Sequence, residues 1–262
     1  MIHVVRVRRF ILGCIICSTL LHAGIARATI VEFQTSMGNF QVNLYDNGTP
    51  QTVANFLAYV NNNAYSASIV HRSQANFVIQ GGGFDTTFDP VTANAAVVNE
   101  PEFSNVRGTI SMARPPGGLD TATNQWFINL SNNSAGLDVQ NFAVFGEVVG
   151  DGMDVVDAIA ALPTFPFESP FNQIPLTDYT NADFSNNVPV DETNLVVISA
   201  VVITDATVDS AGAAGLNPAP NTLNDPVAPP PASGGGGGGN FGLLGVIALL
   251  CAIRRRHLLQ VR

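Results

Sequence analysis

Cysteine and histidine are scarce in this chain of 262 residues, and their positions leave little for chemistry. All three cysteines lie close to the two ends, and His71 is the only histidine between residues 29 and 205. That central part has no disulfide and no thiolate metal site, and a Ser-His-Asp triad or a histidine metal site has almost nothing to be built from. We therefore expect no metal and no cofactor.

Basic residues are equally few. The chain has no lysine, and eight of its eleven arginines lie before residue 29 or after residue 253. The other three, Arg72, Arg107 and Arg114, accompany twenty acidic residues, which gives the part between the two ends a net charge of −17. A body this acidic repels nucleic acid and anionic membranes, so we expect neither surface as a partner of the domain. We expect a monomer.

Both ends of the chain have the composition of processing signals. Residues 1–28 combine early arginines, an apolar run and small residues before position 29, which predicts a secretory signal peptide cleaved after Ala28. Residues 206–239 are rich in proline, asparagine, alanine and glycine, which predicts a disordered linker. In residues 240–262 a short apolar run precedes three consecutive arginines.

This last arrangement resembles the glycine-rich C-terminal sorting signals of some Gram-negative secreted proteins. The alternative is a membrane anchor that stays attached. We therefore expect an exported protein, located in the periplasm, at the cell surface or in the medium, and tethered to the membrane for as long as its C-terminal segment is present.

The part between residues 29 and 205 has the patterning of one domain. Short alternating segments predict β-strands, and apolar residues at helical spacing predict two helices. Thr49-Pro50 indicates an N-cap with proline at the first helical position, and Asp151 indicates a second cap. The aperiodic segment 163–189 is expected to be a long surface loop. Strands are expected at 29–35, 40–44, 68–72, 76–81, 109–113, 126–130, 143–149 and 195–203, and helices at 50–60 and 153–161.

Three blocks of residues carry the signal for function. They are VHRSQANFVIQGGGF at 70–84, GTISMAR at 108–114 and QWFIN at 125–129. In this order they resemble the cyclophilins, which are peptidyl-prolyl cis-trans isomerases, and the resemblance covers residues 29–204. It implies a mainly β fold, in which eight antiparallel strands form a closed barrel capped by two α-helices. Many short strands without strand-helix alternation independently favour a closed antiparallel barrel.

The resemblance also implies the site. Arg72, Gln80 and Phe77 are the expected catalytic residues: Arg72 donates to the proline nitrogen, Gln80 positions Arg72 and the substrate carbonyl, and Phe77 lines the proline pocket. Two of the pocket positions depart from the family, because valine stands at 78 for methionine and phenylalanine at 142 for histidine or tyrosine. The expected substrate-binding residues are Val78, Ala113, Arg114, Gln125, Phe127, Leu137 and Phe142.

Arginine suits this reaction for a physical reason. An X-Pro bond rotates slowly because the lone pair of the amide nitrogen is delocalised, which gives a barrier of about 18–20 kcal/mol. Rotation needs no proton transfer and no covalent step, but it needs a pocket for the twisted proline and a donor aimed at the nitrogen. A guanidinium is always charged, rigid and only a donor, so it can stabilise the twisted state.

Several of these residues have simpler explanations when taken singly. His71 and Trp126 alternate in direction with Arg72 and Phe127, so we expect both in the core. The glycines at 81–83 indicate a tight turn, because no Gly-Lys-Ser/Thr follows to make a phosphate loop. The function expected is isomerisation of X-Pro bonds in exported proteins, with proline-containing polypeptides as partners. The alternative is a non-catalytic peptide-binding chaperone or scaffold on the same fold.

Overall fold

The computed structural model describes residues 29–206 and 216–223. The predicted signal peptide (1–28) and the predicted C-terminal segment (240–262) lie outside these residues, as does most of the predicted linker (206–239). None of the helices in the described ranges has the length and apolarity that a membrane span needs.

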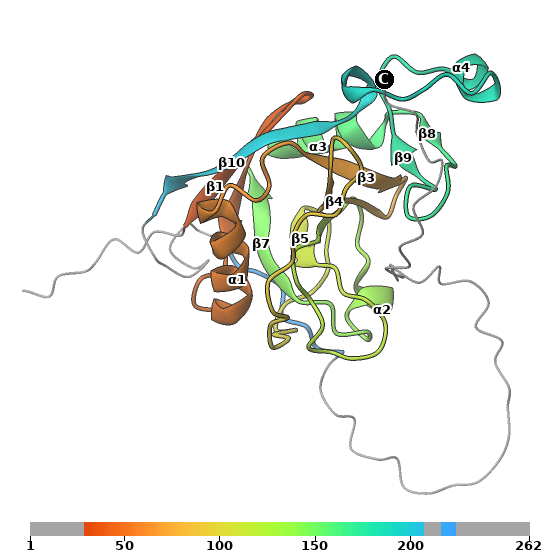
Figure 1. Ribbon diagram of the computed structural model, residues 1–262. Helices are drawn as coiled ribbons and strands as arrows, with labels where there is room; N and C mark the ends of the chain where they lie inside the picture. Colours follow the sequence, from red (N-terminus) through yellow and green to blue (C-terminus); the bar gives the residue numbers. More distant parts are fainter. Residues whose placement is uncertain (1–28, 207–215, 224–262) are drawn as a thin grey trace, which may run out of the picture.

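Eight antiparallel strands close into a barrel in the order β1-β10-β3-β4-β6-β5-β7-β2 (Figure 1). In β1, Val31 and Phe33 are fully buried whereas Glu32 and Gln34 are partly exposed, because successive side chains point to opposite faces. The predicted mainly β fold with a closed eight-stranded barrel is therefore confirmed. The strands are β1 (Ile30–Thr35), β2 (Gly38–Leu44), β3 (Ser68–Gln74), β4 (Val78–Asp85), β5 (Thr109–Met112), β6 (Trp126–Asn129), β7 (Val144–Val149) and β10 (Val197–Asp205).

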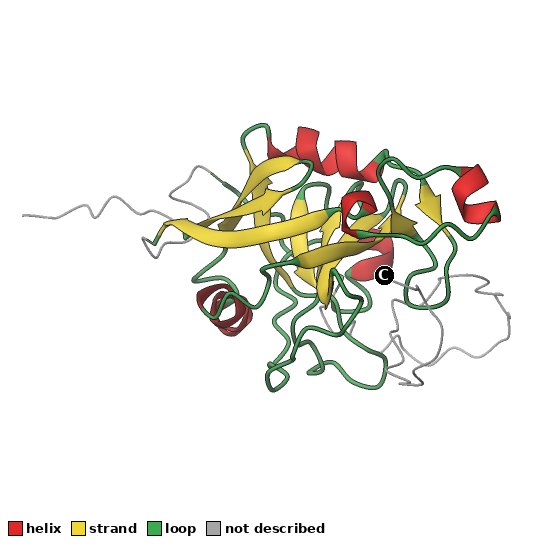
Figure 2. Ribbon diagram, turned by 45° about the horizontal axis from the view of Figure 1, so that its top comes forward, coloured by secondary structure: helices red, strands yellow, loops and turns green. Residues whose placement is uncertain are grey.

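Two longer helices lie on opposite sides of the barrel (Figures 1 and 2). Helix α1 (Pro50–Asn61) packs against β10, and α3 (Gly152–Ala160) packs against β2, β4 and β7. They are the two capping helices that the sequence predicts. Two short helices, α2 (Ser134–Leu137) and α4 (Asn181–Ser185), and a 3-10 turn, η1 (Glu192–Asn194), were not predicted.

The two residues predicted as N-caps precede their helices, but they do not cap them. Thr49 and Asp151 precede α1 and α3, yet neither side chain accepts a cap hydrogen bond. Neither residue has the extended backbone that aims a capping side chain at the first turn. At α1 the Glu100 carboxylate caps the first turn instead, because it accepts from Thr52 N at 2.8 Å and from Gln51 N at 3.2 Å.

The three consecutive glycines belong to a strand and not to the predicted turn. They lie within β4, where the strand passes over two large side chains. A Cβ on Gly81 would come within 2.7 Å of the Trp126 ring, and one on Gly83 within 2.7 Å of the Gln125 amide carbon. Gly82 also has a φ of +76°, which disfavours any other residue. These glycines therefore make room for the third sequence block.

The segment between α3 and β10 is structured, although the sequence predicts a surface loop at 163–189. It contains a two-stranded sheet, β8 (Thr164–Phe165) and β9 (Ile174–Pro175), followed by α4 and η1. Its aromatic residues are spaced irregularly and so give no periodic signal, but they pack into their own apolar cluster with Ile69 and Phe84 of the barrel. Figure 1 shows β9 beside β3, which it contacts.

Residues 216–223, which the sequence places in a disordered linker, pack against the domain instead. Ser104 N donates to Ala219 O at 2.8 Å, and Asn221 N donates to Glu102 O at 2.8 Å. Leu216 packs against a small apolar cluster around Tyr45. These contacts attach the segment to the loop that precedes β5.

Candidate active site

Three of the expected site residues form one row across neighbouring strands. Arg72 on β3 is directly opposite Gln80 on β4, and Gln80 is opposite Phe127 on β6. Residues that face one another in antiparallel strands project from the same face of the sheet. The register of β3 against β4 shifts between Val70 and Arg72, an irregularity that can re-aim a side chain. The row therefore places a guanidinium, an amide and an aromatic ring side by side.

The Arg72 guanidinium is held by three glutamine amides. Its Nη2 donates to Gln74 Oε1 at 2.6 Å, its Nη1 to Gln80 Oε1 at 3.4 Å and its Nε to Gln173 Oε1 at 3.3 Å. Its central carbon lies 5.9 Å from the centroid of the Phe77 ring. Partial burial lowers the pKa of Arg72 from its ordinary value, but a guanidinium still keeps its charge at neutral pH. Neutral acceptors thus hold a positive charge in place.

An apolar cluster lies next to this charge. It contains five of the expected substrate-binding residues, all buried, and Phe77 packs against it. Two of its aromatic rings meet edge to face, with centroids 5.7 Å apart, an arrangement that favours a defined geometry. The five residues are Val78, Ala113, Phe127, Leu137 and Phe142.

Arg114 and Gln125 border the cluster from the loop between β5 and β6. The Arg114 guanidinium lies over the Phe142 ring, 4.8 Å from its centroid, and it donates to the backbone carbonyl of Gln140. Gln125 Oε1 accepts from Gln80 Nε2 at 2.9 Å. A chain of hydrogen bonds therefore links Gln125 through Gln80 to Arg72.

A buried carboxylate stabilises the side of the apolar cluster that α2 contributes through Leu137. We call this side the wall of the site. Asp138 follows Leu137 directly and is 1% exposed. Its carboxylate accepts from Ser104 Oγ at 2.5 Å, from Asn105 N at 2.8 Å and from Asn105 Nδ2 at 2.9 Å. Asn105 Nδ2 also donates to Phe142 O at 3.1 Å. The network fixes the backbone beside two members of the apolar cluster.

His71 and Trp126 lie away from the site, as expected from their alternation with Arg72 and Phe127. Trp126 is fully buried in the main barrel core. His71 is buried against Phe84, with ring centroids 5.1 Å apart. Burial, together with the nearby Arg72 charge, lowers the pKa of His71 to about 3, so the imidazole is neutral at physiological pH. It cannot serve there as a general acid.

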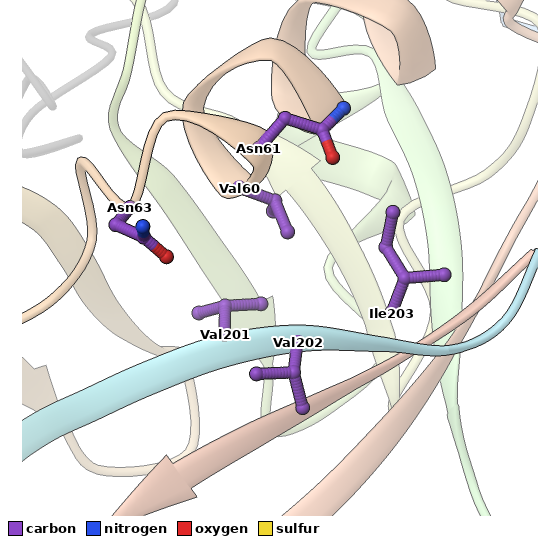
Figure 3. Close-up of a pocket in the computed structure, with 6 residues that line it drawn as sticks. All are labelled: Val60, Asn61, Asn63, Val201, Val202 and Ile203. Atoms are coloured by element: carbon purple, nitrogen blue, oxygen red, sulfur yellow. The ribbon is translucent and has the colours of Figure 1, made fainter.

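A hollow of about 240 Å³ lies elsewhere, between the end of α1 and β10 (Figure 3). None of its lining residues is ionisable or belongs to the row at Arg72: Val60, Asn61, Asn63, Val201, Val202 and Ile203. Across the described ranges, no group of three or more His, Cys, Asp or Glu side chains is arranged to hold a metal ion.

Comparison with known proteins identifies the family of this chain. The family model of the cyclophilin type peptidyl-prolyl cis-trans isomerases matches residues 30–181. This chain belongs to that family. Because the match includes all three sequence blocks, the family and the enzyme class that the sequence predicts are confirmed.

Three curated relatives carry the same name. A peptidyl-prolyl cis-trans isomerase of Acinetobacter baylyi is 43% identical over 150 residues, which are 55% of this chain and 79% of the relative. Isomerase A of Dickeya dadantii is 42% identical over 142 residues, or 52% of this chain and 74% of the relative. Isomerase B of Escherichia coli is 38% identical over 143 residues, or 52% and 86%. The cyclophilin matches therefore span most of each relative.

Sequence reasoning missed two residues that contact the Arg72 guanidinium. Gln74 lies two positions after Arg72 on β3, so the strand period could have found it. Gln173 is 101 positions away, in the segment that has no period, and no local signal points to it. The structure brings all the expected site residues to one region, while their individual roles remain predictions.

Proposed function

We propose that this cyclophilin domain isomerises X-Pro bonds in exported proteins and so assists their folding. Membership of the isomerase family supports the reaction. The observation that carries the proposal is the charged Arg72, held by neutral amides in the same row as Phe127 of the apolar cluster. Proline-containing polypeptides are the proposed substrates.

Each part of the site has a task in this reaction. The proline ring packs against Phe77, Phe127 and Leu137, and the chain on either side of it lies along Ala113 and Gln125. As the X-Pro bond twists, the nitrogen regains its lone pair and becomes a hydrogen-bond acceptor for Arg72. The planar forms lack this acceptor, so the hydrogen bond stabilises the twisted state selectively. One such preorganised donor is worth about 2.7–4 kcal/mol of barrier.

Export is the second part of the proposal. The composition of residues 1–28 and of residues 240–262 supports passage across a membrane, followed by sorting or anchoring at the C-terminus. Cell fractionation with mass spectrometry of both ends of the mature protein tests it. An uncleaved N-terminus in the cytoplasmic fraction would refute export, and the mature C-terminus would separate a released protein from a tethered one.

The reaction itself is tested with the full chain and a short X-Pro peptide. We expect the chain to accelerate cis-to-trans exchange and Arg72→Ala to remove most of that acceleration while peptide binding persists. Binding without acceleration in the wild-type chain would instead support a chaperone or scaffold on the same fold.

A further inference from the structure

Gln173 reaches the site from outside the barrel. It lies in the segment between α3 and β10, and its backbone carbonyl accepts from Ser73 N at 2.8 Å. Its neighbours Phe171 and Ile174 are buried in the apolar cluster of that segment. Because backbone and cluster both fix this stretch to β3, the Gln173 side chain starts from a defined position beside Arg72.

The contact that Gln173 makes is the one that orients a guanidinium. A guanidinium has five N–H donors, and its Nε–H is the one nearest the aliphatic stem. The Nε hydrogen bond to Gln173 restricts rotation of the planar group about that stem. Gln74 and Gln80 then engage one N–H of each terminal nitrogen, which leaves a second N–H on each of them. The free N–H groups are the ones available to a substrate.

The three side chains that accept from Arg72 carry no charge. Acidic residues outnumber arginines by twenty to three in the part between the two ends, yet the three acceptors of Arg72 are neutral amides. A carboxylate in the same place would form a stronger, charge-assisted hydrogen bond. It would also offset the positive charge that must act on the proline nitrogen.

We propose that Gln173 is a positioning residue, which orients the Arg72 guanidinium through Nε without neutralising it. This inference rests on the proposed isomerase function and extends its site to a segment outside the three sequence blocks. Gln173 does not touch the substrate, and it acts only through Arg72.

Two substitutions separate this role from simple support of the fold. Gln173→Met keeps the length of the side chain but removes the acceptor. Gln173→Glu keeps the acceptor and adds a charge. Asn172→Asp is the matched control, because Asn172 is the exposed neighbour and the charge change is the same. Backbone hydrogen bonding to Ser73 remains possible in all three variants.

The measurements are kcat and KM for a short X-Pro peptide, the melting temperature of the full chain, and the Nε–H NMR resonance of Arg72, assigned by its loss in Arg72→Lys. We expect Gln173→Glu to lower kcat by at least about tenfold while the melting temperature is unchanged or higher. Gln173→Met should lower kcat several-fold with little change in KM. Both should move the Arg72 resonance, and Asn172→Asp should leave kcat, melting temperature and resonance unchanged.

Other outcomes have distinct meanings. A Gln173→Glu variant with wild-type kcat and a shifted resonance would overturn the inference, since the contact would exist without mattering for the reaction. An unshifted resonance in both Gln173 variants would overturn the contact itself. A wild-type chain without isomerase activity would refute the proposed function and with it the catalytic role, whereas the resonance would still report on the contact.

Discussion

Arg72 and Arg107 occupy opposite environments in the same acidic domain. Arg107 forms a two-pronged ion pair with Asp157 on α3, with its Nη2 2.6 Å from Asp157 Oδ2, and both side chains are nearly half exposed. The hydrogen bond that Arg107 donates to Asp157 raises the pKa of Arg107, whereas burial lowers the pKa of Arg72. Arg72 is partly buried and bonded to neutral amides.

The difference shows how a site can keep a charge available. An exposed ion pair offsets its own charge and is screened by salt, so it has little left to act on a third group. A guanidinium that is oriented by amides in a partly dry setting keeps its full charge, and the lower local dielectric strengthens its effect on a nearby nitrogen. Substitutions of the two arginines and of Asp157 test this contrast, and substitutions of His71 and Asn221 test the packing around the site.

The largest effect is expected from replacing each arginine by lysine. Lysine keeps the charge but loses the planar fork that three amides hold, so Arg72→Lys should lower kcat/KM by about 10²-fold. Arg107→Lys should stay within about twofold of the wild type, because Arg107 lies outside the site. Peptide isomerisation by both full-chain variants, with melting curves to check folding, provides the measurement.

Equal losses in the two variants would show that the environment of Arg72 gives it no role that Arg107 lacks. Wild-type activity in Arg72→Lys would show that a point charge suffices. Either result would remove the contrast on which the assignment of Arg72 depends.

The second prediction concerns His71, which shares β3 with Arg72 but faces the core. Its pKa is about 3 in the folded chain and about 6.5 in an unfolded one, so below pH 6.5 the unfolded state binds a proton that the folded state does not. The free energy of unfolding should therefore fall as the pH is lowered, by about 2 kcal/mol between pH 7 and pH 5. Urea titrations across this range measure it.

His71→Phe is the control for this slope, because it fills the same apolar site without titrating. Its absolute stability can differ from that of the wild type, but its stability should change much less between pH 7 and pH 5. Parallel pH profiles for the two proteins would mean that His71 is not held neutral by burial.

Some parts of the fold and the site could be predicted from the sequence, and others could not. The barrel was predictable because strands such as β1 alternate buried and exposed residues. The row from Arg72 to Phe127 follows from the first and third sequence blocks, which lie on the adjacent strands β3, β4 and β6. The contact of Gln173 with Arg72 was not predictable, because the two residues are 101 positions apart and the aromatic residues of the Gln173 segment are spaced irregularly.

The packing of residues 216–223 against the domain could not be predicted from the sequence for another reason. Its main hydrogen bonds join backbone groups, such as Ser104 N to Ala219 O, and backbone groups leave no mark on composition. A stretch rich in asparagine, proline and alanine has the composition of a linker whether it docks or not. Glu100 at the start of α1 is similar, because a distant side chain replaced the local cap that the pattern predicts.

The third prediction tests whether this docked segment supports the wall of the site. Asn221 is buried, and its Nδ2 donates to Asp138 O at 3.4 Å, behind α2. Asn221→Ala should lower the free energy of unfolding by about 1 kcal/mol, the usual net value of a lost hydrogen bond. Thr222→Ala, at the exposed next position, should cost less than about 0.5 kcal/mol. Identical denaturation curves for Asn221→Ala and the wild type would mean that the Asn221 side chain contributes nothing to the wall.

The smallest effect is expected at the ion pair. Asp157→Asn removes the charge opposite Arg107, and an exposed pair of this kind contributes about 0.5 kcal/mol at low salt. The loss should disappear in about 1 M salt, where the Debye length is about 3 Å. Glu168→Gln, at another exposed carboxylate, corrects for the change in net charge. Isomerase activity should be unaffected in both variants, because Arg107 loses its carboxylate partner but keeps its hydrogen bond to Leu130 O, outside the site. If removing the charge of Asp157 raised the activity, a cation outside the row of Arg72, Gln80 and Phe127 would be able to act on the substrate, and position in that row would no longer distinguish the two arginines.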